Sequence, residues 1–177
     1  VEKVALADCL GYVLAEDVFS DMDMPPFDKS AMDGFACRRA DLPGPLQIIE
    51  EIPAGKMPEK AIGMGEAARI MTGAPLPQGA DCVFMLEDSA EESEEMVRFT
   101  ANNTSDNFCR CGEDVRTDEC VLKKGEWLGP AHLAILATVG AVEVLVAKRP
   151  RLGIIATGSE LVEVGAKPQG AAIRNSN

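Results

Sequence analysis

Residues 82–99, CVFMLEDSAEESEEMVRF, carry the pattern that decides the fold. Two short apolar runs, residues 82–86 and 96–99, enclose an acidic stretch. Apolar runs of this length are too short for a helix and are typical of buried strands, and a run of glutamates between them is typical of a solvated loop or hairpin tip. The stretch therefore predicts β-structure.

The same pattern extends over the surrounding sequence. Further short apolar runs occupy residues 46–49 and 68–71, and Gly, Pro, Asn and Asp separate the runs. These four residue types favour turns, so the pattern predicts strands joined by turns. A polar, proline-bearing stretch over residues 21–26 indicates a boundary near residue 20.

The flanking segments have a mixed pattern. Residues 1–6 predict a short strand, and residues 9–15 predict a brief helix with Asp8 as its N-cap. Residues 121–146 predict a strand, a helix with Pro130 in its first turn, and a second strand. The two segments are therefore expected to build a small α/β domain together.

Three units follow from this segmentation. Residues 1–18 and 119–148 form the discontinuous small α/β domain, and residues 19–118 form a β-rich domain inserted in it. Residues 149–177 open with an apolar run, 151–156, that predicts the first strand of another α/β domain. Because a βαβ unit takes about 30 or more residues, we expect this third domain to be truncated and the chain to be a fragment. The predicted fold class is thus a mixture of α/β and mostly-β units.

The composition excludes several classes of function. Of the 177 residues, 46% are hydrophobic, which suffices for a buried core. The net charge of −12 repels nucleic-acid backbones and anionic lipid heads, so we expect neither as a partner. No apolar run approaches the roughly 20 residues that cross a bilayer, and we expect a cytoplasmic protein.

The cysteines leave a second chemistry open. Six cysteines in irregular positions do not form a disulfide scaffold, and reduced thiols are expected. Cys109, Cys111 and Cys120 offer three thiolates for zinc or copper, one fewer than the four ligands of a usual structural zinc site. A thiol-based metal-handling module is therefore an alternative function.

Four segments combine residues that can carry chemistry. PPFDKSAMDGFA (25–36) can hold Mg²⁺ through its carboxylates or form an ordinary Asp-Gly turn. RIMTGAPLPQGAD (69–81) ends a strand in a stiff turn whose amides suit an oxyanion or simply a hairpin. CRCGED (109–114) places Arg110 to clamp a phosphate or to pair with the adjacent acids. TGSE (157–160) follows an apolar run, where open α/β sheets bind ligands.

Taken in this order, the segments resemble the molybdopterin molybdenumtransferase family, the bacterial MoeA proteins, which is related to the E domain of gephyrin. The resemblance implies an enzyme of molybdenum cofactor biosynthesis that takes adenylylated molybdopterin and molybdate, breaks the adenylate with Mg²⁺, and releases AMP. It also implies an elongated homodimer with sites formed across the dimer, a molybdopterin-binding third domain, and molybdopterin adenylyltransferase as pathway partner.

The resemblance further assigns roles to residues. It implies Asp33, Thr72 and Glu160 as catalytic residues. The implied metal ligands are Asp33 and Asp28, and those implied for substrate binding are Ser30, Arg110 and Asp114. A non-catalytic scaffold related to the gephyrin E domain remains an alternative. Because much of the implied site lies beyond residue 177, we expect the fragment alone to be inactive.

Overall fold

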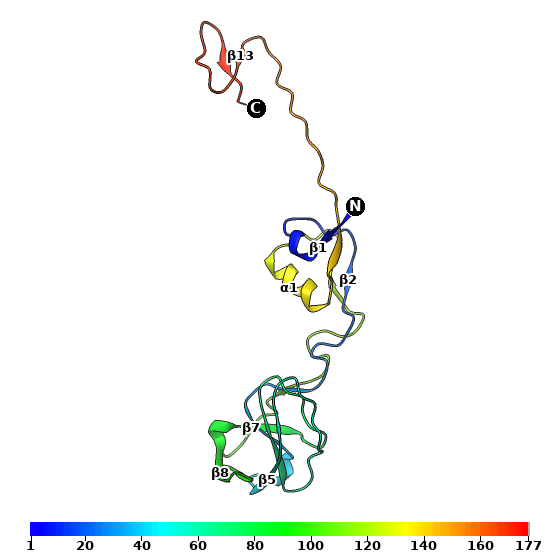
Figure 1. The fold of residues 1–177 in the computed structure, drawn as a ribbon, viewed down its shortest axis with the longest axis vertical. Helices are drawn as coiled ribbons and strands as arrows, with labels where there is room; N and C mark the ends of the chain where they lie inside the picture. Colours follow the sequence, from blue (N-terminus) through cyan, green and yellow to red (C-terminus); the bar gives the residue numbers. More distant parts are fainter. Residues whose placement is uncertain (177) are drawn as a thin grey trace.

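Figure 1 shows the computed structural model, which describes residues 1–176. A β-rich body occupies one end of the long axis, a smaller unit with helix α1 lies in the middle, and an extended stretch leads to the C-terminal end. The described residues are mostly β, with α1 (Pro130–Thr138) as their one α-helix. No helix in residues 1–176 has the length and apolarity to cross a membrane.

The β-rich body is built on a six-stranded sheet in the order β7-β4-β6-β5-β9-β8. Its strands are β4 (Gly34–Cys37), β5 (Leu46–Ile52), β6 (Glu66–Ile70), β7 (Cys82–Met85), β8 (Ser89–Ser93) and β9 (Met96–Phe99). The β5–β6 pair is parallel and the other pairs are antiparallel. The strands predicted from the short apolar runs are confirmed.

The acidic stretch is partly the predicted hairpin tip, because Glu94 and Glu95 form the turn, but its first part is a strand. This part forms β8, an edge strand that pairs with β9, whereas β7 lies at the opposite edge of the sheet. Glu91 pairs with Arg69 at 2.7 Å, and Glu92 pairs with Arg98 at 2.7 Å. These ion pairs offset the charge of an edge strand, which the sequence pattern alone does not reveal.

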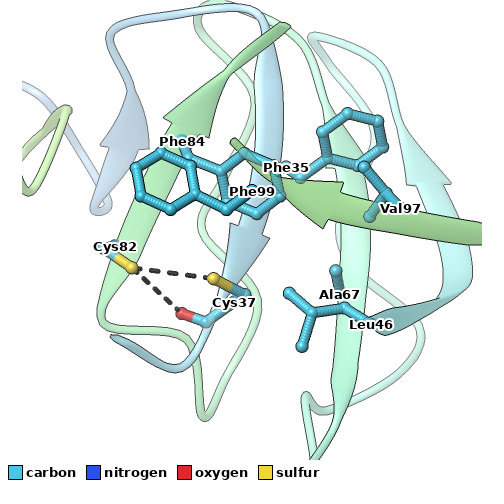
Figure 2. Close-up of a cluster of buried hydrophobic side chains, with 8 residues drawn as sticks. All are labelled: Phe35, Cys37, Leu46, Ala67, Cys82, Phe84, Val97 and Phe99. Carbon is cyan, nitrogen blue, oxygen red and sulfur yellow. Dashed lines mark hydrogen bonds between the residues drawn. The ribbon is translucent and has the colours of Figure 1, made fainter. Parts of the chain in front are cut away.

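Strands β4, β6 and β7 are buried on both faces, and their side chains enter two apolar clusters. Side chains alternate along β4: Phe35 and Cys37 enter one cluster, and Ala36 enters the other. Figure 2 shows the first cluster, in which the Phe35 and Phe84 rings stack with centroids 5.3 Å apart. The thiols of Cys37 and Cys82, register partners on β4 and β7, lie 3.7 Å apart in the same cluster.

The smaller unit joins the two ends of the predicted discontinuous domain. β1 (Glu2–Ala5) pairs with β12 (Glu143–Val146), and β2 (Val18–Phe19) pairs with β11 (Cys120–Leu122). Helix α1 packs its one buried residue, Leu136, into the shared core. The remaining buried members of this core are Cys9, Leu14, Leu122, Leu128, Val144 and Val146.

The predicted helix over residues 9–15 is wrong. A short 3-10 helix, η1 (Leu6–Asp8), is followed by a turn in which Gly11 has a φ of +78°. The Gly11 amide then donates to the Leu128 carbonyl at 2.8 Å, and the Leu14 amide donates to that of Glu126 at 2.8 Å. Long-range pairing thus replaces the local helix.

Two chain segments run side by side between the bodies, residues 20–28 outward and 111–119 back. The Met24 amide donates to the Val115 carbonyl at 2.7 Å. At the sheet end of this connection, β3 (Lys29–Ser30) pairs with β10 (Phe108–Cys109). Two 3-10 turns, η2 (Arg39–Asp41) and η3 (Leu86–Asp88), complete the β-rich body.

The C-terminal stretch carries a short parallel pair, β13 (Leu161–Val162) with β14 (Ile173–Arg174). The strand predicted over residues 151–156 is wrong, because among residues 1–176 no strand pairs with this run; Leu152 is 86% exposed. That residues 149–177 begin a third domain stays a prediction, and residue 177 lies outside the described residues.

Candidate functional site

Asp33 is exposed in the loop that joins β3 to β4. The next residue, Gly34, is buried in the middle of the sheet, and a Cβ there would lie 2.0 Å from the carbonyl oxygen of Phe84. No side chain fits in that space, so glycine lets β4 begin directly after the carboxylate. Asp33 is thereby fixed to a rigid strand while its side chain faces solvent.

Thr72 holds the Asp33 carboxylate from the turn that follows β6. The backbone amide and the hydroxyl of Thr72 both donate to Asp33 Oδ1, at 2.7 and 2.8 Å. First the amide and then the hydroxyl lower the pKa of Asp33 below its ordinary value of 3.8. The carboxylate is therefore ionised at neutral pH. No described residue forms a hydrogen bond with its second oxygen, Oδ2.

The backbone of the two loops completes this arrangement. The Ser30 amide donates to the Ala74 carbonyl at 2.9 Å, and the Gly73 amide donates to the Ser30 carbonyl at 2.8 Å. Gly73 has a φ of +84°, which glycine adopts without strain. We call residues 30–33 with 71–74 the Asp33 clasp. Sequence reasoning identified Asp33 and Thr72 but not the backbone contacts that join their loops.

Ser30 is buried within the clasp and stabilises the loop that carries Asp33. Its hydroxyl donates to the Met32 carbonyl at 2.6 Å, and the side chain is only 1% exposed. The substrate-binding role of Ser30 stays a prediction. What the contacts show is a serine that shapes the loop carrying Asp33.

Asp28 and the 109–114 loop lie on the other side of β3. Asp28 Oδ1 accepts a hydrogen bond from the Cys111 amide at 2.7 Å, and the Asp114 amide donates to the Met24 carbonyl at 2.9 Å. The exposed Arg110 side chain pairs with Asp106 at 3.3 Å. Because exposed ion pairs are weak, Arg110 is free to exchange this partner for an anion.

Glu160 lies far from these residues within one chain. It is exposed on the stretch between α1 and β13, which Figure 1 shows leading to the end of the molecule opposite the six-stranded sheet. The structure therefore brings Asp33 and Thr72 together, places Asp28 and the 109–114 loop next to β3, and leaves Glu160 apart.

The residues present suit a hard cation better than a soft one. In residues 1–176 no three His, Cys, Asp or Glu side chains gather in a metal-holding group, so the three thiols do not form a site. Magnesium needs fewer protein ligands, because it binds through one or two carboxylates together with water and substrate phosphate. An ionised Asp33 with a free oxygen fits that requirement.

Comparison with known proteins gives a consistent result. The family model described as "MoeA N-terminal region (domain I and II)" matches residues 1–140. Molybdopterin molybdenumtransferase of Staphylococcus aureus (strain Mu50) is 42% identical over 181 residues, which cover 98% of this chain and 43% of that protein. The corresponding protein of a Staphylococcus epidermidis strain is 39% identical over 182 residues, 99% of this chain and 43% of that protein.

The fold has a close counterpart among solved structures. The crystal structure of the molybdopterin biosynthesis moeA protein from Pyrococcus horikoshii superimposes with a TM-score of 0.85 at 38% identity, covering 94% of this chain and 46% of that one. The chain thus spans less than half the length of the relatives that it matches.

Proposed function

The chain belongs to the MoeA family, and from this premise we propose that the full-length protein containing it is a molybdopterin molybdenumtransferase of molybdenum cofactor biosynthesis. Its substrates are adenylylated molybdopterin and molybdate, and AMP is the leaving product. The observation that supports this most is the Asp33 clasp, because it presents an ionised carboxylate oxygen to solvent.

Each residue of the candidate site has a part in this reaction. Mg²⁺, when bound, neutralises charge on the adenylate phosphates during their cleavage. Asp33 would hold that cation, and Thr72 keeps Asp33 ionised and oriented. Asp28, the second carboxylate that the resemblance implies, accepts a hydrogen bond from the Cys111 amide on the other side of β3. Arg110 attracts the phosphates, which a chain of net charge −12 otherwise repels.

A site completed across a homodimer would give Glu160 a place near Asp33. Within one chain Glu160 and Asp33 lie apart, so Glu160 would reach the clasp of a second copy. Mixing Asp33→Ala and Glu160→Ala forms of the full-length protein should then restore roughly one quarter of wild-type turnover, because half of the random dimers contain one intact site. No recovery after subunit exchange would contradict the shared site.

The reaction itself is tested by AMP release. The full-length protein, given adenylylated molybdopterin, molybdate and Mg²⁺, should release AMP, and Asp33→Ala should lower turnover by about 100-fold or more. Glu87→Ala is the matched control, because it removes an exposed carboxylate that has no side-chain hydrogen bond in the described residues and that follows Leu86, whose amide donates to the Asp33 carbonyl. Wild-type turnover by Asp33→Ala would refute the role of the clasp.

Three further parts of the proposal concern the cellular setting. Molybdopterin adenylyltransferase supplies the adenylylated substrate, the protein works in the cytoplasm, and neither nucleic acid nor membrane is a partner. Two of the glutamates on strand β8 already pair with arginines of the same chain, so this acidic surface needs no basic partner to balance those charges. Cell fractionation followed by immunodetection tests the location.

A further inference from the structure

The Asp33 clasp has a second copy in the connection between the two bodies. The sequence Ser20-Asp21-Met22-Asp23 repeats the Ser-x-Met-Asp pattern of Ser30-Ala31-Met32-Asp33. The Ser20 hydroxyl donates to the Met22 carbonyl at 2.6 Å, as the Ser30 hydroxyl does to that of Met32. Both serines are only 1% exposed. The two loops therefore share one local structure.

Thr117 plays the part of Thr72 in this second copy. Its backbone amide and hydroxyl donate to Asp23 Oδ1 at 2.7 and 2.8 Å, the distances found between Thr72 and Asp33. The amide of Thr117, and then its hydroxyl, lower the pKa of Asp23. Asp23 is thus held as an ionised carboxylate in the same way as Asp33.

The backbone contacts recur as well. The Ser20 amide donates to the Glu119 carbonyl at 2.9 Å, and the Asp118 amide donates to the Ser20 carbonyl at 2.9 Å. Asp118 has a φ of +64°, at the position where the Asp33 clasp has Gly73. We call residues 20–23 with 116–119 the Asp23 clasp.

The second carboxylate oxygen distinguishes the two copies. The Cys111 thiol donates to Asp23 Oδ2 at a sulfur–oxygen distance of 3.7 Å, and Gly112 lies beside the same carboxylate. Oδ2 of Asp23 therefore has a protein neighbour, whereas Oδ2 of Asp33 has no hydrogen-bond partner among the described residues. Its contacts lead into the 109–114 loop, whose Gly112 amide donates to the Pro25 carbonyl at 2.9 Å.

We propose that Asp23 and Thr117 are positioning residues for this loop. The loop is anchored at one end by the β3–β10 pair beside the Asp33 clasp and at the other end by the Asp23 clasp. Holding both ends keeps Arg110 at a fixed place relative to Asp33. The use of Arg110 for substrate rests on the proposed function, whereas the anchoring of the loop does not.

Amide hydrogen exchange on the 177-residue chain tests the anchoring. Asp23→Ala and Thr117→Val should speed the exchange of the Cys111, Gly112 and Thr117 amides by about tenfold, the effect of losing one charged hydrogen bond. Sheet amides such as Ile70 should keep their rates. Thr117→Ser restores the hydroxyl and should restore protection, and Glu87→Ala, which removes an exposed carboxylate outside both clasps, should change nothing.

Kinetics of the full-length protein test the link to substrate. Asp23→Ala should raise KM for adenylylated molybdopterin by about threefold or more and leave kcat within about twofold, because the chemistry at Asp33 is untouched. Unchanged exchange at Cys111 and Gly112 in a folded Asp23→Ala protein would overturn the anchoring of the loop, and faster exchange with an unchanged KM would overturn the link from the anchored loop to substrate binding. If the full-length protein releases no AMP, the proposed function fails while the exchange result stands.

Discussion

The two clasps differ in what surrounds an identical set of hydrogen bonds. At the Asp33 clasp the carboxylate is exposed and one of its oxygens has no hydrogen-bond partner among the described residues. At the Asp23 clasp the corresponding oxygen contacts the Cys111 thiol and the carboxylate is half-buried. The same hydrogen-bond geometry thus occurs in both clasps, and the surroundings of the second carboxylate oxygen distinguish the Asp33 clasp from the Asp23 clasp.

The comparison also changes the interpretation of Thr72. A threonine with the same two contacts, Thr117, holds a carboxylate whose second oxygen lies 3.7 Å from the Cys111 thiol. The contacts of Thr72 are those of a positioning residue that keeps Asp33 charged, and a catalytic role of its own stays a prediction. The predictions below disturb one clasp at a time.

The largest effect is expected from Gly34→Ala. A Cβ at this position would lie 2.0 Å from the Phe84 carbonyl oxygen, so β4 and β7 would have to separate. Overpacking against backbone in the middle of a sheet should cost about 3 kcal/mol of unfolding free energy. Urea unfolding measures this cost, and a loss below about 1 kcal/mol would show that the sheet adapts. The Asp23 clasp, which continues into Met24, has no such constraint.

A smaller loss is expected from Gly73→Ala. The nearest atom to a Cβ there is the Ala54 side chain at 3.9 Å, so space is available and only the φ of +84° is unfavourable. The left-handed conformation should cost the alanine about 1 kcal/mol. Thermal unfolding of Gly73→Ala beside Gly125→Ala, an open glycine at a φ of +94° away from both clasps, separates clasp loss from general strain.

Asp118→Gly is expected to increase the stability of the folded chain instead of lowering it. Asp118 holds a φ of +64° at the position that glycine occupies in the other clasp. Glycine relieves the left-handed strain but gives the unfolded chain more freedom, so the net gain should be about 0.5 kcal/mol. A clear loss of stability in the same thermal unfolding assay would mean that the Asp118 side chain contributes to the clasp.

The smallest effects are expected in the titration of the two carboxylates. Hydrogen bonds from threonine lower the pKa of Asp33 and of Asp23 below 3.8. The unfolded chain then binds these protons more readily, so this contribution to stability is present above pH 3.8 and is lost as the pH falls through the folded pKa values.

Removal of one hydroxyl should move one pKa. Thr72→Val should raise the pKa of Asp33 and leave that of Asp23, and Thr117→Val should do the reverse. The shift is partial because the backbone amide, the larger cause, remains. Carboxyl carbon chemical shifts measured against pH give both values; a common shift in both residues would contradict two independent clasps.

The sequence predicted the elements that local pattern controls. The apolar runs at 46–49, 68–71 and 96–99 became strands, and Pro130 began the helix that was expected there. The helix expected over 9–15 failed because Leu14 pairs with distant backbone. Which strands are neighbours depends on such long-range contacts. The acidic run was predicted as a loop or hairpin tip; Glu94 and Glu95 form that tip, whereas Glu91 and Glu92 lie in β8 because Arg69 and Arg98 pair with them.

Only those site residues that lie in recognisable sequence motifs were predicted. Asp33 and Thr72 were named from the resemblance, and the structure joins them. The Asp23 clasp was missed, although its Ser-x-Met-Asp signal is visible in the sequence. Its partner Thr117 lies far along the chain in a turn without a recognisable motif, so only the fold could connect the two.

The most direct test compares kcat for AMP release between Asp33→Asn and Asp23→Asn in the full-length protein. Both changes remove one charge and keep one acceptor oxygen for threonine, so they differ only in which clasp is altered. We predict a fall of about 100-fold or more for Asp33→Asn and a change within about twofold for Asp23→Asn. Equal effects on kcat would contradict the assignment of chemistry to the Asp33 clasp.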